Sequence, residues 1–323
     1  MFFWKKKPTE AELAQQKRQE EAIAALTNGD IPQFAKHRLL EHANRDDRFF
    51  SSDLTTNEFM LMREAGVQPL CLVMGSAFFN VSFWGRGINR PKSGPMRDIS
   101  AAQLMARRNA LQRMEKEAQL LGADGVVGVR VVRNQHAFID GQVEFTAIGT
   151  AVKIPGHKSN GTPFMSALSA KDFWQLHNAG FVPKGLALGC SVYYAAMDRE
   201  TRNSMFTFWG NNARVNQEIR LYTQSFYEAR EEAMNSLTRD GVEHNADGVI
   251  GVTVDETIRE QHWEISNVEY IDLLIDFTVM GTTIEKIDAP SRTNKPPLIM
   301  IDLATRSQRA IDINFDLPSY YNE

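Results

Sequence analysis

The chain has 323 residues, of which 43% are hydrophobic and 24% are charged, and its formal net charge is −4. This balance is typical of a soluble globular protein of about two domains, and it excludes a largely disordered chain. It offers no electrostatic attraction for nucleic acid, and no stretch approaches the roughly 20 apolar residues that cross a bilayer.

Residues 1–50 predict an N-terminal helical arm that lies outside any compact domain. Strong helix formers run from Thr9 to Leu26, and Asn28-Gly29 supplies a helix stop. A second short helical stretch follows from Ile31 to Ala43. Arms of this kind commonly contact neighbouring subunits or a protein partner, and we expect the same here.

The first residues are candidates for an interface. Phe2, Phe3 and Trp4 precede three lysines, whereas a secretory signal has its charges first. We therefore expect no export signal in this segment. Bulky apolar residues beside lysines suit a partner's groove or peripheral contact with an anionic membrane surface, and a terminus folded back on its own oligomer is the alternative.

Residues 51–156 predict a first α+β repeat. A short helix ends at Ala65-Gly66, a strand covers residues 67–79, and a long helix covers residues 100–121. On the long helix, an apolar stripe predicts the face that packs on a sheet. We expect the polar positions of the same helix to face solvent. The stripe consists of Leu104, Leu111, Met114 and Leu121, and the polar positions are Arg107, Arg108, Arg113, Glu115 and Lys116.

After the long helix, Gly122 and Asp124-Gly125 predict a sharp entry into a strand over residues 126–132. Asp140-Gly141 is a strong hairpin signal and leads to a strand over residues 143–154. The sequence thus predicts a helix packed on a small, mostly antiparallel sheet.

The rest of the chain predicts a linker at residues 157–163, a second repeat at residues 164–289 and an extended tail at residues 290–323. The linker is short and polar. The tail either adds a strand to the edge of a neighbouring sheet or stays disordered.

An internal duplication supports this division. Gly122–Val129 reads Gly-Ala-Asp-Gly-Val-Val-Gly-Val, and Asn245–Val252 reads Asn-Ala-Asp-Gly-Val-Ile-Gly-Val. The matches extend over the preceding helix and both flanking strands, at a constant offset within each element. A whole supersecondary unit was therefore duplicated, and we expect the same fold in both copies.

The first copy is similar to the YbjQ-like family, which carries a heavy-metal-binding label. The similarity rests on Ala106-Arg107 and Ala110 in the long helix, on Gly122–Val129, and on the strand end Gly149–Lys153. The second copy is more divergent. The resemblance implies compact α+β domains that assemble as homo-oligomeric rings, typically pentamers.

Two pairs of acidic residues occupy equivalent positions in the copies. Asp124 and Asp247 bind a cation or, at lower cost, accept hydrogen bonds from backbone amides in a tight turn. Glu144 and Asp276 point away from the apolar face of their strands, where they line a pore, face solvent, or pair with arginines across a subunit contact. All four are ligand candidates at subunit boundaries.

Trp84 and Trp209 lie in the connections between elements, where they are candidates either for a protein interface or for burial under their own loop. The only cysteines, Cys71 and Cys190, have no Cys-x-x-Cys spacing, so a disulfide scaffold and a thiolate metal site are poorly supported. We expect a reducing, cytoplasmic location.

No serine elbow, zinc-protease motif or phosphate loop is present, so we predict no catalytic residues, no metal ligands and no cofactor. The sequence predicts an α+β protein of two tandem repeats with an N-terminal helical arm and an extended C-terminal tail. Its predicted function is that of a non-enzymatic, ring-forming homo-oligomeric scaffold or binding module. The alternatives are binding of a metal or small ligand at subunit boundaries and, last, an unrecognised enzyme.

Overall fold

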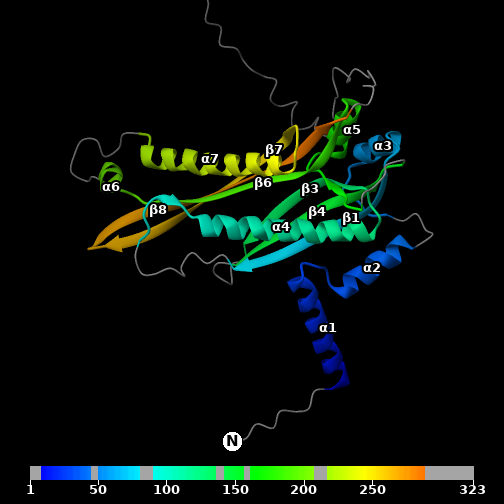
Figure 1. Ribbon diagram of the computed structural model, residues 1–323. Helices are drawn as coiled ribbons and strands as arrows, with labels where there is room; N and C mark the ends of the chain where they lie inside the picture. Colours follow the sequence, from blue (N-terminus) through cyan, green and yellow to red (C-terminus); the bar gives the residue numbers. More distant parts are fainter. Residues whose placement is uncertain are drawn as a thin grey trace, which may run out of the picture.

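The computed structural model describes residues 9–44, 50–80, 90–135, 142–155, 161–206 and 217–287. They form a mixed α+β fold of two repeats, each with a long helix packed on its own sheet (Figure 1). The predicted fold class is therefore confirmed. None of the helices in these ranges has an apolar stretch long enough to cross a membrane.

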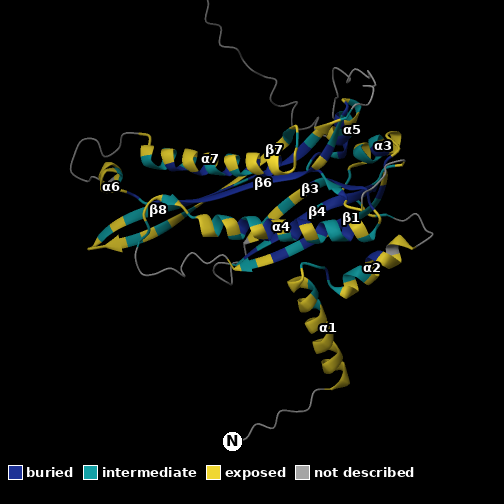
Figure 2. Cartoon of the chain, viewed as in Figure 1, coloured by how far each residue is buried: buried dark blue, intermediate teal, exposed yellow. Residues whose placement is uncertain are grey.

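The N-terminal arm consists of α1 (Glu10–Thr27) and α2 (Gln33–Ala43). Thr9 and Glu12 close α1 with a reciprocal capping box, but the helix buries none of its residues and projects away from the repeats (Figure 2). By contrast, α2 contacts the long helix of the first repeat. The arm is thus attached through α2 and presents α1 to solvent.

The first repeat contains α3 (Thr56–Glu64), β1 (Gln68–Asn80), α4 (Arg97–Leu120), β3 (Gly125–Gln135) and β4 (Gln142–Lys153). The central strand β4 pairs antiparallel with both β1 and β3. The helix α4 starts at Arg97, three residues before the predicted helix, and no side chain caps it at Met96.

The second repeat contains α5 (Ala170–Asn178), β6 (Phe181–Ala195), α7 (Arg220–Glu243), β7 (Gly248–Ile265) and β8 (Val268–Lys286). It repeats the order of the first, with a further short helix α6 (Arg199–Phe206) before α7. Here the central strand is β8, between β6 and β7. The β7–β8 hairpin is much longer than its counterpart and closes through Ser266 and Asn267, which both have positive φ.

Two short strands cross between the repeats, and neither follows from the sequence patterns. β2 (Gly94–Pro95) belongs to the connection before α4 but pairs with β6 of the second repeat. β5 (Phe164–Met165) precedes the second repeat but pairs in parallel with β3 of the first. The sheet orders are therefore β1-β4-β3-β5 and β2-β6-β8-β7.

The long helix α4 lies between the two sheets. One side packs on its own sheet, where the backbone of Gly75 approaches the helix so closely that an added Cβ would stand 2.1 Å from the Ala110 carbonyl oxygen. Its other side packs on the second sheet, so β6 is buried along most of its length (Figure 2). We call the face of each sheet opposite its own long helix the outer face.

Because α4 is packed between two sheets, the prediction that its polar positions face solvent is wrong for Arg107. Leu111 and Met114 are buried as the apolar stripe predicted, but Arg107 is only 3% exposed instead of facing solvent. Its guanidinium lies over the ring of Phe145, 4.4 Å from the ring centroid, and against the outer face of the second sheet. The predicted stripe did not mark a single packing side, because Leu111 lies against Leu186 and Leu188 of the second sheet, and the amphipathic pattern gave no sign of that sheet.

Candidate functional site at the junction of the repeats

A buried polar cluster joins the repeats where α4 and β3 meet β8. Asp276 accepts a hydrogen bond from Gln103 Nε2 at 2.7 Å and forms an ion pair with Arg133. Beside it, Arg107 donates to Thr278 Oγ1 at 2.7 Å. Since Gln103, Arg107 and Arg133 belong to the first repeat and their partners to the second, the cluster ties the two repeats together.

A second cluster lies near the start of α4. Arg90 donates from Nε to Asp272 Oδ2 at 2.7 Å, and Tyr194 and the backbone N–H of Met197 donate to the same buried carboxylate. Burial and the hydrogen bond to Asp272 raise the pKa of the Tyr194 hydroxyl above its ordinary value. Trp263 Nε1 donates to Tyr194 Oη at 2.8 Å, which connects the long hairpin to this cluster.

The acidic pair Glu144 and Asp276 has two different environments. Asp276 is 1% exposed and paired with an arginine, so it does not face solvent, and its arginine comes from the same chain instead of a neighbouring subunit. Glu144 is partly exposed and accepts a hydrogen bond from Thr146. The positions are equivalent in register, but only the outer face that carries Asp276 is covered by α4.

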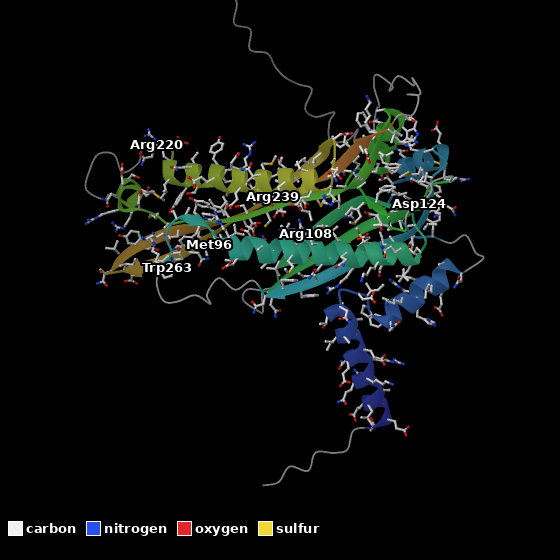
Figure 3. All side chains as sticks on the ribbon, viewed as in Figure 1. Met96, Arg108, Asp124, Arg220, Arg239 and Trp263 are labelled. Atoms are coloured by element: carbon white, nitrogen blue, oxygen red, sulfur yellow. The ribbon has the colours of Figure 1, made fainter. Side chains whose placement is uncertain are left out.

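Asp124 and Asp247 both organise a turn. Asp124 is buried, and its carboxylate accepts hydrogen bonds from Lys153 Nζ and from the backbone N–H of Ile154, each at 2.8 Å. Asp247 is exposed and accepts from the backbone N–H of Lys286 at 2.7 Å. Figure 3 places Asp124 at the opposite end of α4 from Met96, whereas Asp276 bonds Gln103 in the N-terminal half of that helix, so these two candidates do not converge on one site.

A matched pair that sequence reasoning missed is Glu117 and Asp240. Both are buried on the long helices and accept a hydrogen bond from a strand amide, Met74 N–H at 2.9 Å and Leu188 N–H at 2.8 Å respectively. Burial raises the pKa of Glu117 above its ordinary value. The sequence did contain a signal for this pair, because Glu117 and Asp240 are acidic residues at equivalent positions of the two copies.

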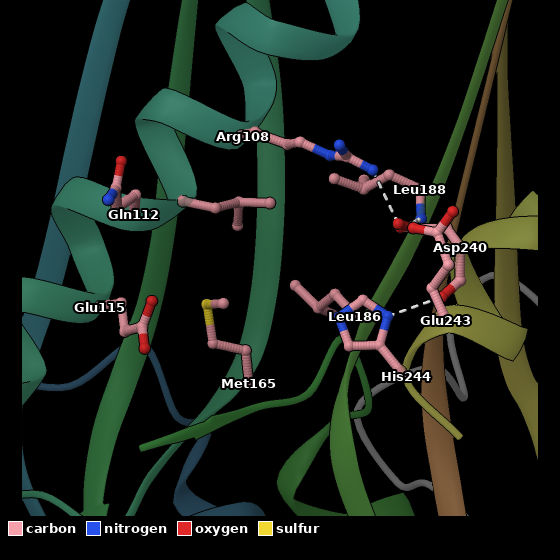
Figure 4. Close-up of a pocket in the computed structure, with 10 residues that line it drawn as sticks. Arg108, Gln112, Glu115, Met165, Leu186, Leu188, Asp240, Glu243 and His244 are labelled. Carbon is pink, nitrogen blue, oxygen red and sulfur yellow. Dashed lines mark hydrogen bonds and ion pairs between the residues drawn. The ribbon is translucent and has the colours of Figure 1, made fainter. Parts of the chain in front are cut away.

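A groove of about 450 Å³ opens between the C-terminal halves of the two long helices (Figure 4). Arg108 of α4 spans it to reach Asp240 at 2.7 Å, and His244 bonds the Asp240 carbonyl oxygen. The floor is apolar, from Leu186 and Leu188. Burial raises the pKa of Glu115, which lines the wall facing α7.

The thiols are separated and differ in access. Cys190 is buried beneath α4, and burial raises its pKa to about 11, whereas Cys71 is partly exposed. We expect a thiol reagent at pH 8 to modify one cysteine in the folded protein and two after unfolding. Mass mapping of the labelled peptide should assign the fast thiol to Cys71; rapid labelling of Cys190 would contradict its burial.

Among the described residues, no group of three or more His, Cys, Asp or Glu side chains is arranged to hold a metal ion. The interface candidates Phe2, Phe3, Trp4, Trp84 and Trp209 lie outside the described residues. The site supported by the geometry is therefore the junction itself: a polar cluster, a groove and two exchanged strands.

Comparison with known proteins agrees with the duplicated fold. Residues 72–155 and 188–285 each match the YbjQ family, described as "Putative heavy-metal-binding", and together they make up more than half of the chain. The encapsulin nanocompartment protein Rv1762c of Mycobacterium tuberculosis is 34% identical over 251 residues, which cover 76% of this chain and 89% of that protein.

Shorter relatives match single parts of the chain. A UPF0145 protein of Vibrio campbellii is 40% identical over 68 residues, covering 21% of this chain and 64% of its own length. A UPF0145 protein of Thermotoga maritima is 49% identical over 49 residues, 15% of this chain and 44% of its own length. This chain therefore belongs to the YbjQ family, of which it carries two copies in tandem.

Proposed function

We propose that the protein is a non-enzymatic, homo-oligomeric scaffold in which chains pack head to tail into a ring. One observation carries the proposal: the outer face of the second sheet is covered by α4, whereas the equivalent face of the first sheet has no such helix in the described part of the chain. A second copy supplies that helix.

The outer faces of the two sheets correspond pair by pair. Met74 opposite Ile148 in the first sheet matches Leu188 opposite Met280 in the second. Leu188 is 4% exposed beneath α4, but Met74 is 44% exposed. An apolar strand face left open in this way is typical of an interaction surface.

The helix α7 has the complementary property. On α4, Leu111 and Arg107 are buried because the second sheet covers them. Their counterparts on α7 are Met234, which is half-buried, and Arg230, which is exposed. Tyr227, the counterpart of Leu104, is 59% exposed. The side of α7 away from its own sheet thus matches the side of α4 that docks inside the chain.

Packing α7 of one chain on the first sheet of the next is a heterologous contact, because the two surfaces differ. Such contacts close into rings or continue into filaments. The junction inside the chain supports a closed ring over a filament. It already joins two successive repeats through the same kind of helix-on-sheet contact. The resulting ring alternates two non-equivalent repeats.

The biological setting of the scaffold is supported by the Mycobacterium relative, which is named an encapsulin nanocompartment protein. We accordingly propose that this chain assembles as part of, or together with, a protein nanocompartment. The arm helix α1, which buries none of its residues, is available to a protein partner in that assembly. The proposed location is the cytoplasm.

Native mass spectrometry tests the scaffold. We expect the wild-type protein to have a discrete multiple of the chain mass, and Met74→Glu or Tyr227→Glu to weaken assembly by roughly 30-fold in dissociation constant, about 2 kcal/mol. Met105→Glu is the control, since Met105 is 58% exposed on α4 but on neither docking side. A monomeric wild type, or equal effects of all three changes, would overturn the proposal.

The second candidate function is binding of a cation or small ligand in the junction groove. It is favoured by Glu115, whose partly buried carboxyl lines the groove, has no salt bridge among the described residues and has a raised pKa that a bound cation would lower. Metal analysis of the purified protein with and without chelator separates the candidates. Stoichiometric metal lost in Glu115→Gln supports the groove; an oligomer unaffected by chelator and free of metal supports the scaffold alone.

A further inference from the structure

Among the residues that the structure describes, the edge strand β7 of the second repeat has no counterpart of the strand that pairs with β3. β3 is covered by the segment Phe164–Leu168, which we call the pairing segment. The pairing segment precedes the second repeat in the chain but bonds to the first. Its four backbone hydrogen bonds are Phe164 N–H to the Asp124 carbonyl, Ser166 N–H to Val126, Val129 N–H to Ser166, and Gly128 N–H to Leu168, at 2.9 to 3.1 Å.

The start of β3 is buried in a core cluster that includes α4 and against which Met165 and Ala167 of the pairing segment pack. Val126 and Val129 are 0% and 2% exposed. The ring of Phe164 lies directly over Gly125, where an added Cβ would stand 2.2 Å from the nearest ring atom. Glycine at this position is thus required by the aromatic ring that covers it.

Two of the same positions of β7 are open, although Leu168 lies over Gly251, 2.7 Å from where an added Cβ would stand. Val252, the counterpart of Val129, is 39% exposed. Gly248, the counterpart of Gly125, has only Ile284 within reach of an added Cβ, at 4.0 Å. The second repeat therefore carries the same glycine with no ring above it. The backbone bulge is also repeated, because Gly128 and Gly251 both have positive φ, 65° and 60°.

The chain contains one more segment built like the pairing segment. Phe50–Leu54 precedes the first repeat and corresponds position by position to Phe164–Leu168. Phe50 stacks on Phe59 with ring centroids 5.4 Å apart, as Phe164 stacks on Phe173 at 5.7 Å.

The backbone contact of this segment with its own repeat is also the same. Asp53 N–H donates to Thr150 Oγ1 at 3.1 Å, and Ala167 N–H donates to the equivalent Thr282 Oγ1 at 2.9 Å. Both segments are therefore held on the outer face of their own sheet in one geometry. In the described part of the chain, the N–H groups of Phe50 and Ser52 make no backbone hydrogen bond.

We propose that Phe50–Leu54 of a second copy pairs in parallel with β7. The inference rests on the proposed head-to-tail scaffold and assigns its backbone contact. Phe50 of the second copy covers Gly248, and the expected bonds run from Phe50 N–H to the Asp247 carbonyl and from Val252 N–H to the Ser52 carbonyl. Strand addition of this kind gives affinity through backbone bonds and removes an exposed edge.

The geometry is consistent with the docking of α7, since both contacts join the second repeat of one copy to the first repeat of the next. The polar cluster is not repeated at this contact. Phe226 stands where α4 has Gln103, and Glu256 stands where β3 has Arg133. Packing and strand pairing therefore carry the contact between copies, while the ion-pair cluster belongs to the junction inside the chain.

Disulfide trapping tests the pairing in the full-length chain. Gly125 of β3 and Phe164 of β5 are Cα partners, so in the proposed pairing Gly248 and Phe50 of two copies take the same geometry. In a Cys71→Ser background, we expect Phe50→Cys/Gly248→Cys to form covalent multimers on oxidation, seen on a non-reducing gel. Neither single variant should form them, but a mixture of the two should yield dimers.

The matched control is Gly125→Cys/Phe164→Cys, which should close a disulfide inside one chain without a change in mass. Native mass is measured before oxidation. A monomer would overturn the scaffold and the pairing together, whereas an oligomer that does not cross-link would overturn the pairing alone. If cross-linking appears only after removal of residues 288–323, the chain's own tail occupies the edge and the proposal is wrong.

Discussion

Asp276→Ala is expected to lower the free energy of unfolding by about 3–5 kcal/mol, because it leaves the buried guanidinium of Arg133 without its anion. Gln103 loses its acceptor in the same change. Since these donors belong to the first repeat, both repeats should be destabilised together. Chemical denaturation followed by fluorescence and by circular dichroism measures the loss.

A double replacement separates the ion pair from the packing. Arg133→Met/Asp276→Leu removes both charges and keeps apolar volume, so we expect it to recover most of the lost stability. Glu144→Ala is the control at the equivalent position of the first repeat. Because Glu144 is partly exposed, its loss should change stability by less than about 1 kcal/mol. Equal costs for Glu144→Ala and Asp276→Ala would contradict the difference in burial.

Gly189→Ala is the second change with a large expected effect, about 3 kcal/mol or more. Its added Cβ would lie 2.1 Å from the carbonyl oxygen of Ala233 and 2.8 Å from the backbone nitrogen of Leu237. Both are backbone atoms of α7, so the whole helix must move away from β6 and its packing is lost. A thermal melt measures the effect.

Gly185→Ala on the same strand is the control, since its added Cβ would meet nothing closer than 3.7 Å. It should leave the melting temperature nearly unchanged. Gly75→Ala should reproduce the loss in the first repeat, where the helix backbone of α4 lies equally close. If Gly189→Ala melts like Gly185→Ala, the close approach of strand and helix is wrong.

Tandem duplication favours formation of the junction inside one chain over the proposed contact between two copies. The junction inside the chain is always formed, because the linker holds the repeats together at a high effective concentration. It carries the ion pair of Arg133 and Asp276, whose partners come from different repeats. The proposed contact between copies has no such tether and relies on surfaces that match without these charges. In the proposed ring, the duplicated chain would make half of the contacts independent of protein concentration.

The sequence by itself determined the repeated unit. The long helix predicted over residues 100–121 is α4, and the strand predicted over residues 126–132, after the helix-ending Gly122 and the Asp-Gly turn, is β3. These features depend on residues within a few turns of each other, and periodicity reports them directly. The tandem arrangement was visible for the same reason, since equivalent residues repeat along the chain.

Only the tertiary structure decided how the repeats meet. Arg107 was expected in solvent and is buried, because a second sheet packs on the polar side of α4. The pairing segment reads as a short stretch after a polar linker, yet it bonds to a strand of the preceding repeat. Helix periodicity identifies a side of the helix that is apolar. A polar side that is buried against polar or charged partners has no periodic apolar residues, so the sequence pattern does not reveal its burial. Contacts between distant residues depend on the relative placement of the repeats, which local sequence patterns do not encode.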